Sequence, residues 1–332
     1  MSSIQNHAWL LVRRPQGEPT VDCFKWVESA PPKASDGQVV VRNHFLSLDP
    51  YMRGRMDEAQ SYAAPQVLGE VMQGGTVGEV IESLNPSFKP GDRVVGRYGW
   101  QLFGCSDGKD LRRIDTTKAP MQAWLGAVGM PGVTAWYGVN DILQPAAGQT
   151  VVVSAASGAV GSVVGQLAKA RGARVVGIAG GAEKCAIVVD EFGFDACVDY
   201  KAAGFKDDLA AATASGIDRL FENVGGACLD ACLARMNPFG RIAVCGLISS
   251  YNGQAMPVSH FRAVLMKRLM IQGFIISEHM ERWPAALAEL SGLAASGKLR
   301  WRETIAEGLE RAPEAFIGLL RGQNIGKQLV RL

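Results

Sequence analysis

Residues Val151–Gly161 read Val-Val-Val-Ser-Ala-Ala-Ser-Gly-Ala-Val-Gly, and this stretch decides the fold. A β-branched run typical of a buried strand leads through a turn of small residues into an apolar segment of helical length. Gly158 would let a pyrophosphate approach the backbone, and Gly161 would let the helix pack close to the sheet. The start of such a helix offers unpaired N–H groups to a phosphate. The stretch predicts a dinucleotide-binding turn, in which Ala159 and Val160 belong to the same loop.

Taken alone, this motif is weak, because Ala156 stands where the G-x-G-x-x-G pattern has its first glycine. Small-residue turns often serve packing only. The surrounding sequence favours binding, because short β-branched runs alternate with segments of helical length from about residue 150 to 280. The runs are Thr150–Ser154, Arg174–Ile178, Ala196–Tyr200, Arg219–Glu222, Arg241–Cys245 and Leu269–Ile275. With helices such as Val160–Arg171 and Glu183–Phe192 between them, they predict an α/β fold with a doubly wound parallel sheet, the Rossmann arrangement.

The end of the second run bears on the choice of cofactor. An NAD site usually has Asp or Glu about 20 residues after the glycines, whereas this run ends in Ile178–Gly181 without a carboxylate. Lys184 follows at the start of the next helix and could pair with a 2′-phosphate. The alternative is that Lys184 is a solvated helix residue. The missing acid favours NADP over NAD.

The first 125 residues have a different pattern. Short strand candidates lie between Pro, Gly and Asp turns, which suits a mostly antiparallel β domain or partial barrel. They are Trp9–Arg13, Val39–Leu46, Thr76–Ile81 and Asp92–Gly96. After a helix near Trp283–Ser296, the tail Gly326–Leu332 is again strand-like and could return to this domain. We expect two domains, the first of them discontinuous.

Composition excludes several classes of protein. A formal net charge of +2 over 332 residues argues against nucleic acid or an anionic membrane as the partner. The longest apolar runs fall far short of the roughly 20 residues that a membrane helix needs, and residues 1–14 lack the layout of a signal peptide. We therefore expect a cytoplasmic protein. The seven cysteines have no close CxxC pairs, so free and mostly buried thiols are expected, with Cys228 and Cys232 stacked on one buried helix face.

Beyond these patterns, the chain resembles the medium-chain dehydrogenase/reductase superfamily. Within it, the chain is similar to the zinc-free branch of prostaglandin reductases (leukotriene B4 12-hydroxydehydrogenases), plant double-bond reductases and bacterial curcumin reductase. The resemblance covers nearly the whole length. Its markers are Leu48–Arg53, Val94–Gly96, Gly99–Gln101, Gly129–Ala135, Ala155–Gly161, Glu222–Gly226, Gly246–Asn252 and Asn324–Lys327.

The resemblance implies a GroES-like domain over residues 1–125, completed by 299–332, around an inserted Rossmann domain over 126–298. It implies NADP as cofactor and a homodimer. Tyr51 and Tyr251 resemble pocket tyrosines and are the two catalytic candidates, with Tyr251 the first choice as donor to the enolate. Positions similar to cofactor-binding ones are Thr134, Ala156, Gly158, Ala159, Val160, Gly161, Lys184, Tyr200, Asn223, Cys245, Gly246, Ile248, Phe274 and Asn324.

Some of these residues have plain structural alternatives. Asp49-Pro50-Tyr51 could be a turn with a packing aromatic, and Asn223 could cap the next element. Tyr251, in a loop rich in Ser, Asn and Gly, would ordinarily be a surface residue. The resemblance, rather than the local pattern, raises these residues to site candidates.

A catalytic zinc is not expected. The family's Gly-His-Glu ligand segment would fall near Gly69-Glu70, where histidine is missing, and Ser47-Leu48 precede Asp49 where a cysteine is expected. Without a metal, the cofactor must carry the reaction. We expect hydride addition to the β-carbon of a small enone or enal, with Tyr251 stabilising the enolate oxygen. The alternatives are an NADPH quinone reductase of the same superfamily and a non-catalytic NADPH-binding protein.

Overall fold

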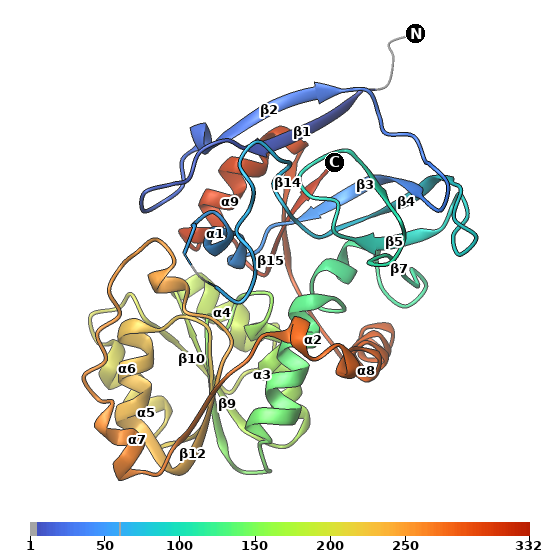
Figure 1. Cartoon of the computed structure of the whole chain (residues 1–332). Coiled ribbons are helices and arrows are strands. Elements are labelled where there is room, and N and C mark those ends of the chain that lie inside the picture. The colour runs from blue at the N-terminus through green and yellow to red at the C-terminus, as the bar shows by residue number, and fades with distance from the viewer. Residues whose placement is uncertain (1–4, 60) are drawn as a thin grey trace. The chain divides into compact units, whose positions relative to one another are not determined.

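The computed structural model describes residues 5–59 and 61–332 and divides the chain into two compact units (Figure 1). Unit 1 comprises Met1–Gly126 and Glu303–Leu332, and unit 2 comprises Ala127–Arg302. The sequence placed the corresponding boundaries after residue 125 and before residue 299. Each unit has its own sheet and its own hydrophobic core.

Unit 2 contains a six-stranded sheet in the order β10-β9-β8-β11-β12-β13, and every neighbouring pair is parallel. This is the strand order of a dinucleotide-binding doubly wound sheet, which confirms the predicted fold class. The strands are β8 Thr150–Ser154, β9 Arg174–Ala179, β10 Ala196–Asp199, β11 Ile217–Glu222, β12 Met236–Val244 and β13 Met270–Gly273.

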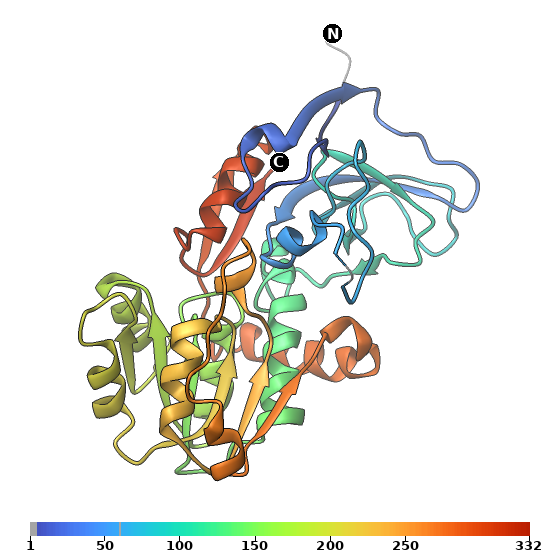
Figure 2. The same cartoon turned by 60° about the vertical axis from the view of Figure 1, so that its left-hand side comes forward.

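Helices lie on both faces of this sheet (Figures 1 and 2). The helices of unit 2 are α2 Met130–Tyr137, α3 Gly161–Ala170, α4 Ala182–Asp190, α5 Phe205–Ala212, α6 Gly226–Arg235, α7 Arg262–Met266 and α8 Trp283–Ala295, of which α8 packs on α2. The core between sheet and helices contains Val152, Val176 and Ile242. Cys228 and Cys232 on α6 are both buried in it, which confirms that their four-residue spacing places them on one buried helix face.

Several strand limits in unit 2 differ from those predicted. β9 ends one residue later, at Ala179, β11 begins two residues earlier, at Ile217, β12 ends one residue earlier, at Val244, and β13 is shorter, at Met270–Gly273. β10 ends at Asp199, one residue before Tyr200, because the Asp199 carboxylate accepts hydrogen bonds from the backbone N–H groups of Gly181 and Lys201 and turns the chain. β12 begins at Met236, before the predicted Arg241. Its first residues include Phe239 with a φ of 63°, and the pairing with β11 shifts register between Ile217 and Arg219. Because the first residues of β12 are irregular, the sequence lacks the continuous β-branched run that would predict a strand there.

Unit 1 contains a seven-stranded sheet in the order β14-β15-β3-β4-β5-β7, with β6 also paired to β3. Its pairs are antiparallel except for the parallel β14–β15 pair. A separate antiparallel hairpin joins β1 and β2. The strands are β1 Asn6–Leu11, β2 Phe24–Ser29, β3 Val39–Ser47, β4 Thr76–Ser83, β5 Arg93–Gly96, β6 Phe103–Ser106, β7 Arg112–Arg113, β14 Glu303–Glu307 and β15 Lys327–Arg331.

The C-terminal segment is part of the core of unit 1. β15 pairs antiparallel with β3, so the tail returns to the first sheet. The helix α9, Ala312–Leu320, brings Phe316 against Trp100, which also stacks on Phe24 with 5.1 Å between ring centroids. Trp100 and Phe316 are fully buried. The first strand runs over Asn6–Leu11, so the prediction of Trp9–Arg13 was wrong at both ends.

The cysteines are all free thiols. Cys23, Cys228 and Cys232 are buried, and the other four are partly exposed, so the expectation of mostly buried thiols was wrong for those four. None of the helices among residues 5–59 and 61–332 has both the length and the apolar content that crossing a membrane requires.

Candidate functional site

The turn between β8 and α3 is held by close backbone packing. Ala155 has a φ of 49°, a left-handed conformation that costs energy for any residue but glycine. A Cβ on Gly161 would lie 2.4 Å from the carbonyl oxygen of Ala155, so glycine is required there. Gly161 was expected to bring the helix close to the sheet. The backbone that it approaches belongs instead to the turn, at Ala155 and Ala156. Gly158 donates its N–H to Ala155 O at 2.9 Å and closes a turn over Ala156 and Ser157, after which Ala159 and Val160 lead into α3.

Ala156 replaces the first glycine of the motif without disturbing the turn. Its side chain is fully buried and its N–H donates to Ile178 O at 3.0 Å. A Cβ on Gly177 of β9 would lie 2.8 Å from the Ala156 Cβ. The missing side chain at Gly177 therefore makes room for the methyl group of Ala156.

The C-terminal ends of β8 and β11 are tied together by polar groups. Asn223 donates its backbone N–H to Ser154 Oγ at 2.8 Å and its Nδ2 to Ser154 O at 2.7 Å. Glu222 is fully buried, and its Oε1 accepts hydrogen bonds from Ser154 Oγ at 3.0 Å and from the N–H of Gly225 at 2.7 Å. Burial raises the pKa of Glu222. Glu222 begins the marker Glu222–Gly226 but was not expected at the site, and its complete burial distinguishes it from an ordinary strand-end carboxylate.

The loop after β12 lies against the same strand ends. Cys245 donates its N–H to Glu222 O at 2.9 Å, and Ile248 donates to Asn223 O at 3.1 Å. The Tyr251 hydroxyl accepts from the Leu247 N–H at 3.4 Å, and a Cβ on Gly246 would lie 3.1 Å from that hydroxyl. Gly246 thus leaves room for the phenol. The structure brings Asn223, Cys245, Gly246, Ile248 and Tyr251 together where doubly wound sheets bind ligands.

A cluster of positive charge lies at the end of β9. A Cβ on Gly180 would lie 2.8 Å from the Tyr200 ring and 3.1 Å from Lys201 Cε, so both side chains extend over this glycine. Burial and then the charge of Lys201 lower the pKa of Lys184. The sequence analysis identified Lys184 and Tyr200 but missed Lys201. Lys201 can extend over the end of β9 because Gly180 has no side chain.

Two expected cofactor residues in unit 2 have side chains that the fold itself uses. Thr134, on α2, donates its hydroxyl to Met130 O at 2.8 Å. Phe274 is buried between the rings of Tyr137 and Phe221, with centroid distances of 5.4 and 6.2 Å. Because the Phe274 ring is packed between two other rings, only its backbone N–H and C=O could bind a ligand.

In unit 1, Tyr51 begins the short helix α1, Tyr51–Arg55, next to a buried ion pair. Lys327 Nζ lies 2.9 Å from Asp49 Oδ1, and the Ser47 hydroxyl donates to the other oxygen of the same carboxylate. Burial and the charge of Asp49 raise the pKa of the Tyr51 phenol, which therefore stays protonated. Asn324, also in unit 1, donates its Nδ2 to Gly326 O at 2.8 Å.

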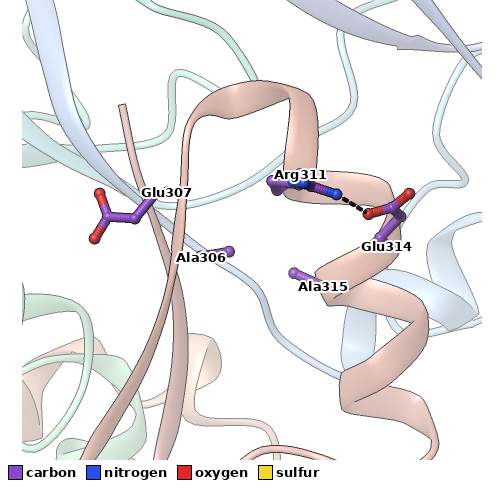
Figure 3. Close-up of a pocket in the computed structure, with 5 residues that line it drawn as sticks. All are labelled: Ala306, Glu307, Arg311, Glu314 and Ala315. Carbon is purple, nitrogen blue, oxygen red and sulfur yellow. Dashed lines mark hydrogen bonds and ion pairs between the residues drawn. The ribbon is translucent and has the colours of Figure 1, made fainter.

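Within the described residues, no three His, Cys, Asp or Glu side chains gather into a metal site. A surface hollow in unit 1 is lined by Ala306, Glu307, Arg311, Glu314 and Ala315 (Figure 3). Arg311 is paired with Glu314 at 2.9 Å, and Glu307 is paired with Arg331. None of the expected site residues lines this hollow, and its charges already have partners.

Comparison with known proteins places the chain in a family. Residues 7–114 match the family described as the N-terminal domain of oxidoreductase, and residues 159–292 match the zinc-binding dehydrogenase family. The chain is 46% identical to the NADPH-dependent curcumin reductase of Escherichia coli (strain K12), with 99% of this chain and 97% of that protein covered. It is 39% identical to prostaglandin reductase 1 of Rattus norvegicus, with 99% of each covered.

A solved structure agrees with these relatives. CurA from Vibrio vulnificus in complex with NADPH is 45% identical to this chain and superposes with a TM-score of 0.93, covering 98% of both chains. The chain belongs to the medium-chain dehydrogenase/reductase superfamily, in the branch that contains the curcumin and prostaglandin reductases.

Proposed function

We propose that the protein is an NADPH-dependent reductase that transfers a hydride to the β-carbon of α,β-unsaturated ketones and aldehydes. The observation that carries this proposal is the identity of 46% over nearly the whole chain to a curcumin reductase. The polar cluster at the ends of β8, β9, β11 and β12 in unit 2 supports it. Curcumin, prostaglandin and 2-alkenal reductases are all named among the relatives.

The residues of unit 2 fit NADP. The glycines of the β8–α3 turn keep side chains away from the start of α3, where N–H groups can meet a pyrophosphate. Lys184 and Lys201 put two positive charges at the end of β9, where an NAD-specific site would have a carboxylate. We assign the adenosine 2′-phosphate to Lys184, Tyr200 and Lys201. Asn223 and the Cys245–Ile248 segment, fixed by backbone hydrogen bonds, would hold the nicotinamide end.

The chain's own contribution to the reaction is binding and hydrogen-bond donation to the substrate. The bound cofactor would supply the hydride. As the β-carbon of the enone accepts it, negative charge grows on the carbonyl oxygen, and a nearby hydroxyl stabilises that charge. We assign this role to the Tyr251 hydroxyl. It accepts the Leu247 N–H, and a hydroxyl that accepts one hydrogen bond can donate another. Tyr51, kept protonated by burial, is the second phenol assigned to the substrate pocket. The enolate then takes a proton at its α-carbon from solvent or a tyrosine.

An NADPH-oxidation assay tests this function. The purified protein is given NADPH with 4-phenyl-3-buten-2-one, and the product is identified by mass spectrometry and NMR. We expect the saturated ketone. Faster turnover of a quinone than of any enone would indicate the quinone reductase alternative. Cofactor binding with turnover of neither substrate would indicate a non-catalytic NADPH-binding protein.

Metal independence is part of the proposal. In zinc enzymes of this superfamily, the segment around Ser47 supplies a cysteine ligand. Here Ser47 donates to Asp49, and the carboxylate is bound by the ammonium of Lys327. These groups neutralise each other without an added cation.

A cytoplasmic location is also proposed. The seven free thiols suit a reducing compartment, and cell fractionation would test it.

We also propose a homodimer formed through the edge strand β13. Its residues Met270 and Ile271 are 40% and 41% exposed, and Leu265 on α7 nearby in sequence is 77% exposed. Exposed apolar edge strands favour pairing with a second strand, and a two-fold axis would let β13 pair with its own copy. Light scattering after gel filtration should give twice the monomer mass. Ile271→Lys should shift the mass toward the monomer, and an unchanged mass would exclude this interface.

A further inference from the structure

The side chain of Arg55 is buried in unit 1 and pairs with no carboxylate in the part of the chain that the structure describes. Arg55 ends α1 and is 8% exposed. Its guanidinium carbon lies 4.4 Å from the centroid of the Tyr62 ring and 6.0 Å from that of the Tyr51 ring. The cation therefore lies against two aromatic rings, one of which belongs to a tyrosine assigned to the substrate pocket. Cation–π contacts of this kind offset part of the cost of burying a charge.

The acidic side chains around α1 are engaged elsewhere. Asp57 pairs with Arg53 at 2.7 Å, and Glu58 pairs with Arg14 at 2.9 Å. Asp49 pairs with the buried ammonium of Lys327. Among residues 5–59 and 61–332, no carboxylate forms an ion pair with Arg55, and its side chain makes no hydrogen bond within that part of the chain.

The charge near Tyr51 is consequently positive. The phenol of Tyr51 is affected by the charges of Asp49, Arg97 and Arg55, and Lys327 neutralises the first of these. Over the described ranges of the chain, neither Arg55 nor Arg97 forms an ion pair with a carboxylate. A buried charge is costly unless it is paired. A guanidinium also presents its N–H groups in a planar fork that matches the two oxygens of a carboxylate. The cost at Arg55 would be recovered when a ligand supplies that carboxylate.

We propose that Arg55 is a substrate-recognition residue that binds a carboxylate located away from the reacting double bond, with Tyr51 and Tyr62 contacting the apolar body of the substrate. The inference rests on the proposed function and narrows its substrate class to enones that carry a carboxylate. Arg55 then contributes to substrate affinity, while the reaction itself takes place at the double bond.

A matched pair of substrates tests this assignment. 4-Carboxychalcone and its methyl ester have the same enone and differ in charge at a distant ring position. With NADPH, we expect the wild-type protein to have a kcat/KM about tenfold or more higher for the acid. Arg55→Gln should reduce the acid-to-ester ratio to about one, mainly through KM for the acid. Arg55→Lys should restore part of the ratio. Arg42→Gln, which removes an exposed arginine on β3, should leave the ratio unchanged.

The outcomes separate this inference from the proposed function. If the folded wild-type protein reduces both compounds with the same kcat/KM, or if Arg55→Gln keeps the acid preference, Arg55 does not bind the carboxylate. If neither compound is reduced, the proposed reductase function fails instead. Should Arg55→Gln not fold, inhibition of the wild-type protein decides. The saturated product 4-(3-oxo-3-phenylpropyl)benzoate should inhibit ester reduction about tenfold more strongly than its own methyl ester, and equal inhibition would overturn the assignment.

Discussion

Replacing the two lysines at the end of β9 should convert an NADPH-selective enzyme into one with no preference. Burial followed by the charge of Lys201 lowers the pKa of Lys184. Their mutual repulsion is unfavourable in the free protein and would be relieved when a dianionic phosphate binds between them. The perturbations are Lys184→Ala, Lys201→Ala and the double variant, with the exposed Lys206→Ala on α5 as control.

The size of the effect follows from burial. A hydrogen bond to a charged group contributes about 1.5–3 kcal/mol, and about 1.4 kcal/mol is tenfold, so Lys184→Ala should raise the KM for NADPH about ten- to a hundredfold. Lys201 is exposed, and an exposed ion pair contributes about 0.2–1 kcal/mol, so its removal should cost only about two- to fivefold. The KM for NADH should remain nearly unchanged in all three variants, since NADH lacks the phosphate.

The assay is initial-rate kinetics with each cofactor at a saturating enone concentration. A lowered pKa means that Lys184 loses its charge at a lower pH than an ordinary lysine. The KM for NADPH should therefore rise with pH in the wild-type protein as this group deprotonates, and the rise should shrink in Lys184→Ala. A KM for NADPH within about twofold of wild type in Lys184→Ala would refute the reasoning. A parallel rise for NADH would do the same.

Three further predictions concern catalysis, stability and metal. Tyr251→Phe should lower kcat by up to about a hundred- to a thousandfold with little change in the KM for NADPH, since one donor to a developing oxyanion is worth about 2.7–4 kcal/mol at most. A kcat within about twofold of wild type, with a deuteride isotope effect showing that chemistry is rate-limiting, would exclude this role. Lys327→Met leaves the Asp49 carboxylate buried and should reduce the free energy of unfolding in urea by about 3–5 kcal/mol. Adding Asp49→Asn should recover much of it, whereas a loss under about 1 kcal/mol would show that the pair is unimportant. Chelators should leave activity intact, and elemental analysis should find less than one zinc per chain; stoichiometric zinc whose removal abolishes activity would contradict the metal-free assignment.

Much of unit 2 could be predicted from the sequence because its signals are local. β8 and the turn after it lie in one continuous stretch, and the glycine at position 161 is required by atoms only a few residues away. The strands β2 and β14 were missed because neither segment has a sequence pattern that indicates which strand it pairs with. β14 exists through its parallel pairing with β15, and Phe24–Ser29, which contains Lys25 and Glu28, pairs in continuous register with β1.

The residues missed at the candidate site share a physical cause. Lys201 extends over Gly180, which has no side chain, and its charge lowers the pKa of Lys184. Arg55 is distinguished by Tyr62 and by the absence of an acidic partner in the described chain. Glu222 is distinguished by complete burial. Each of these properties depends on the neighbours and the burial that the residue acquires on folding. Residue type and spacing in the sequence alone therefore do not reveal it.

The central claim is that hydride passes from the cofactor to the β-carbon of an enone, and isotope transfer tests it most directly. The protein is incubated with NADPH that carries deuterium at C4 of the nicotinamide, on each face in turn, and with 4-phenyl-3-buten-2-one. The account predicts one deuterium at the β-carbon of the saturated ketone, from one of the two labelled cofactors, as seen by NMR. Deuterium at the carbonyl carbon of an allylic alcohol, or none in the product, would contradict it.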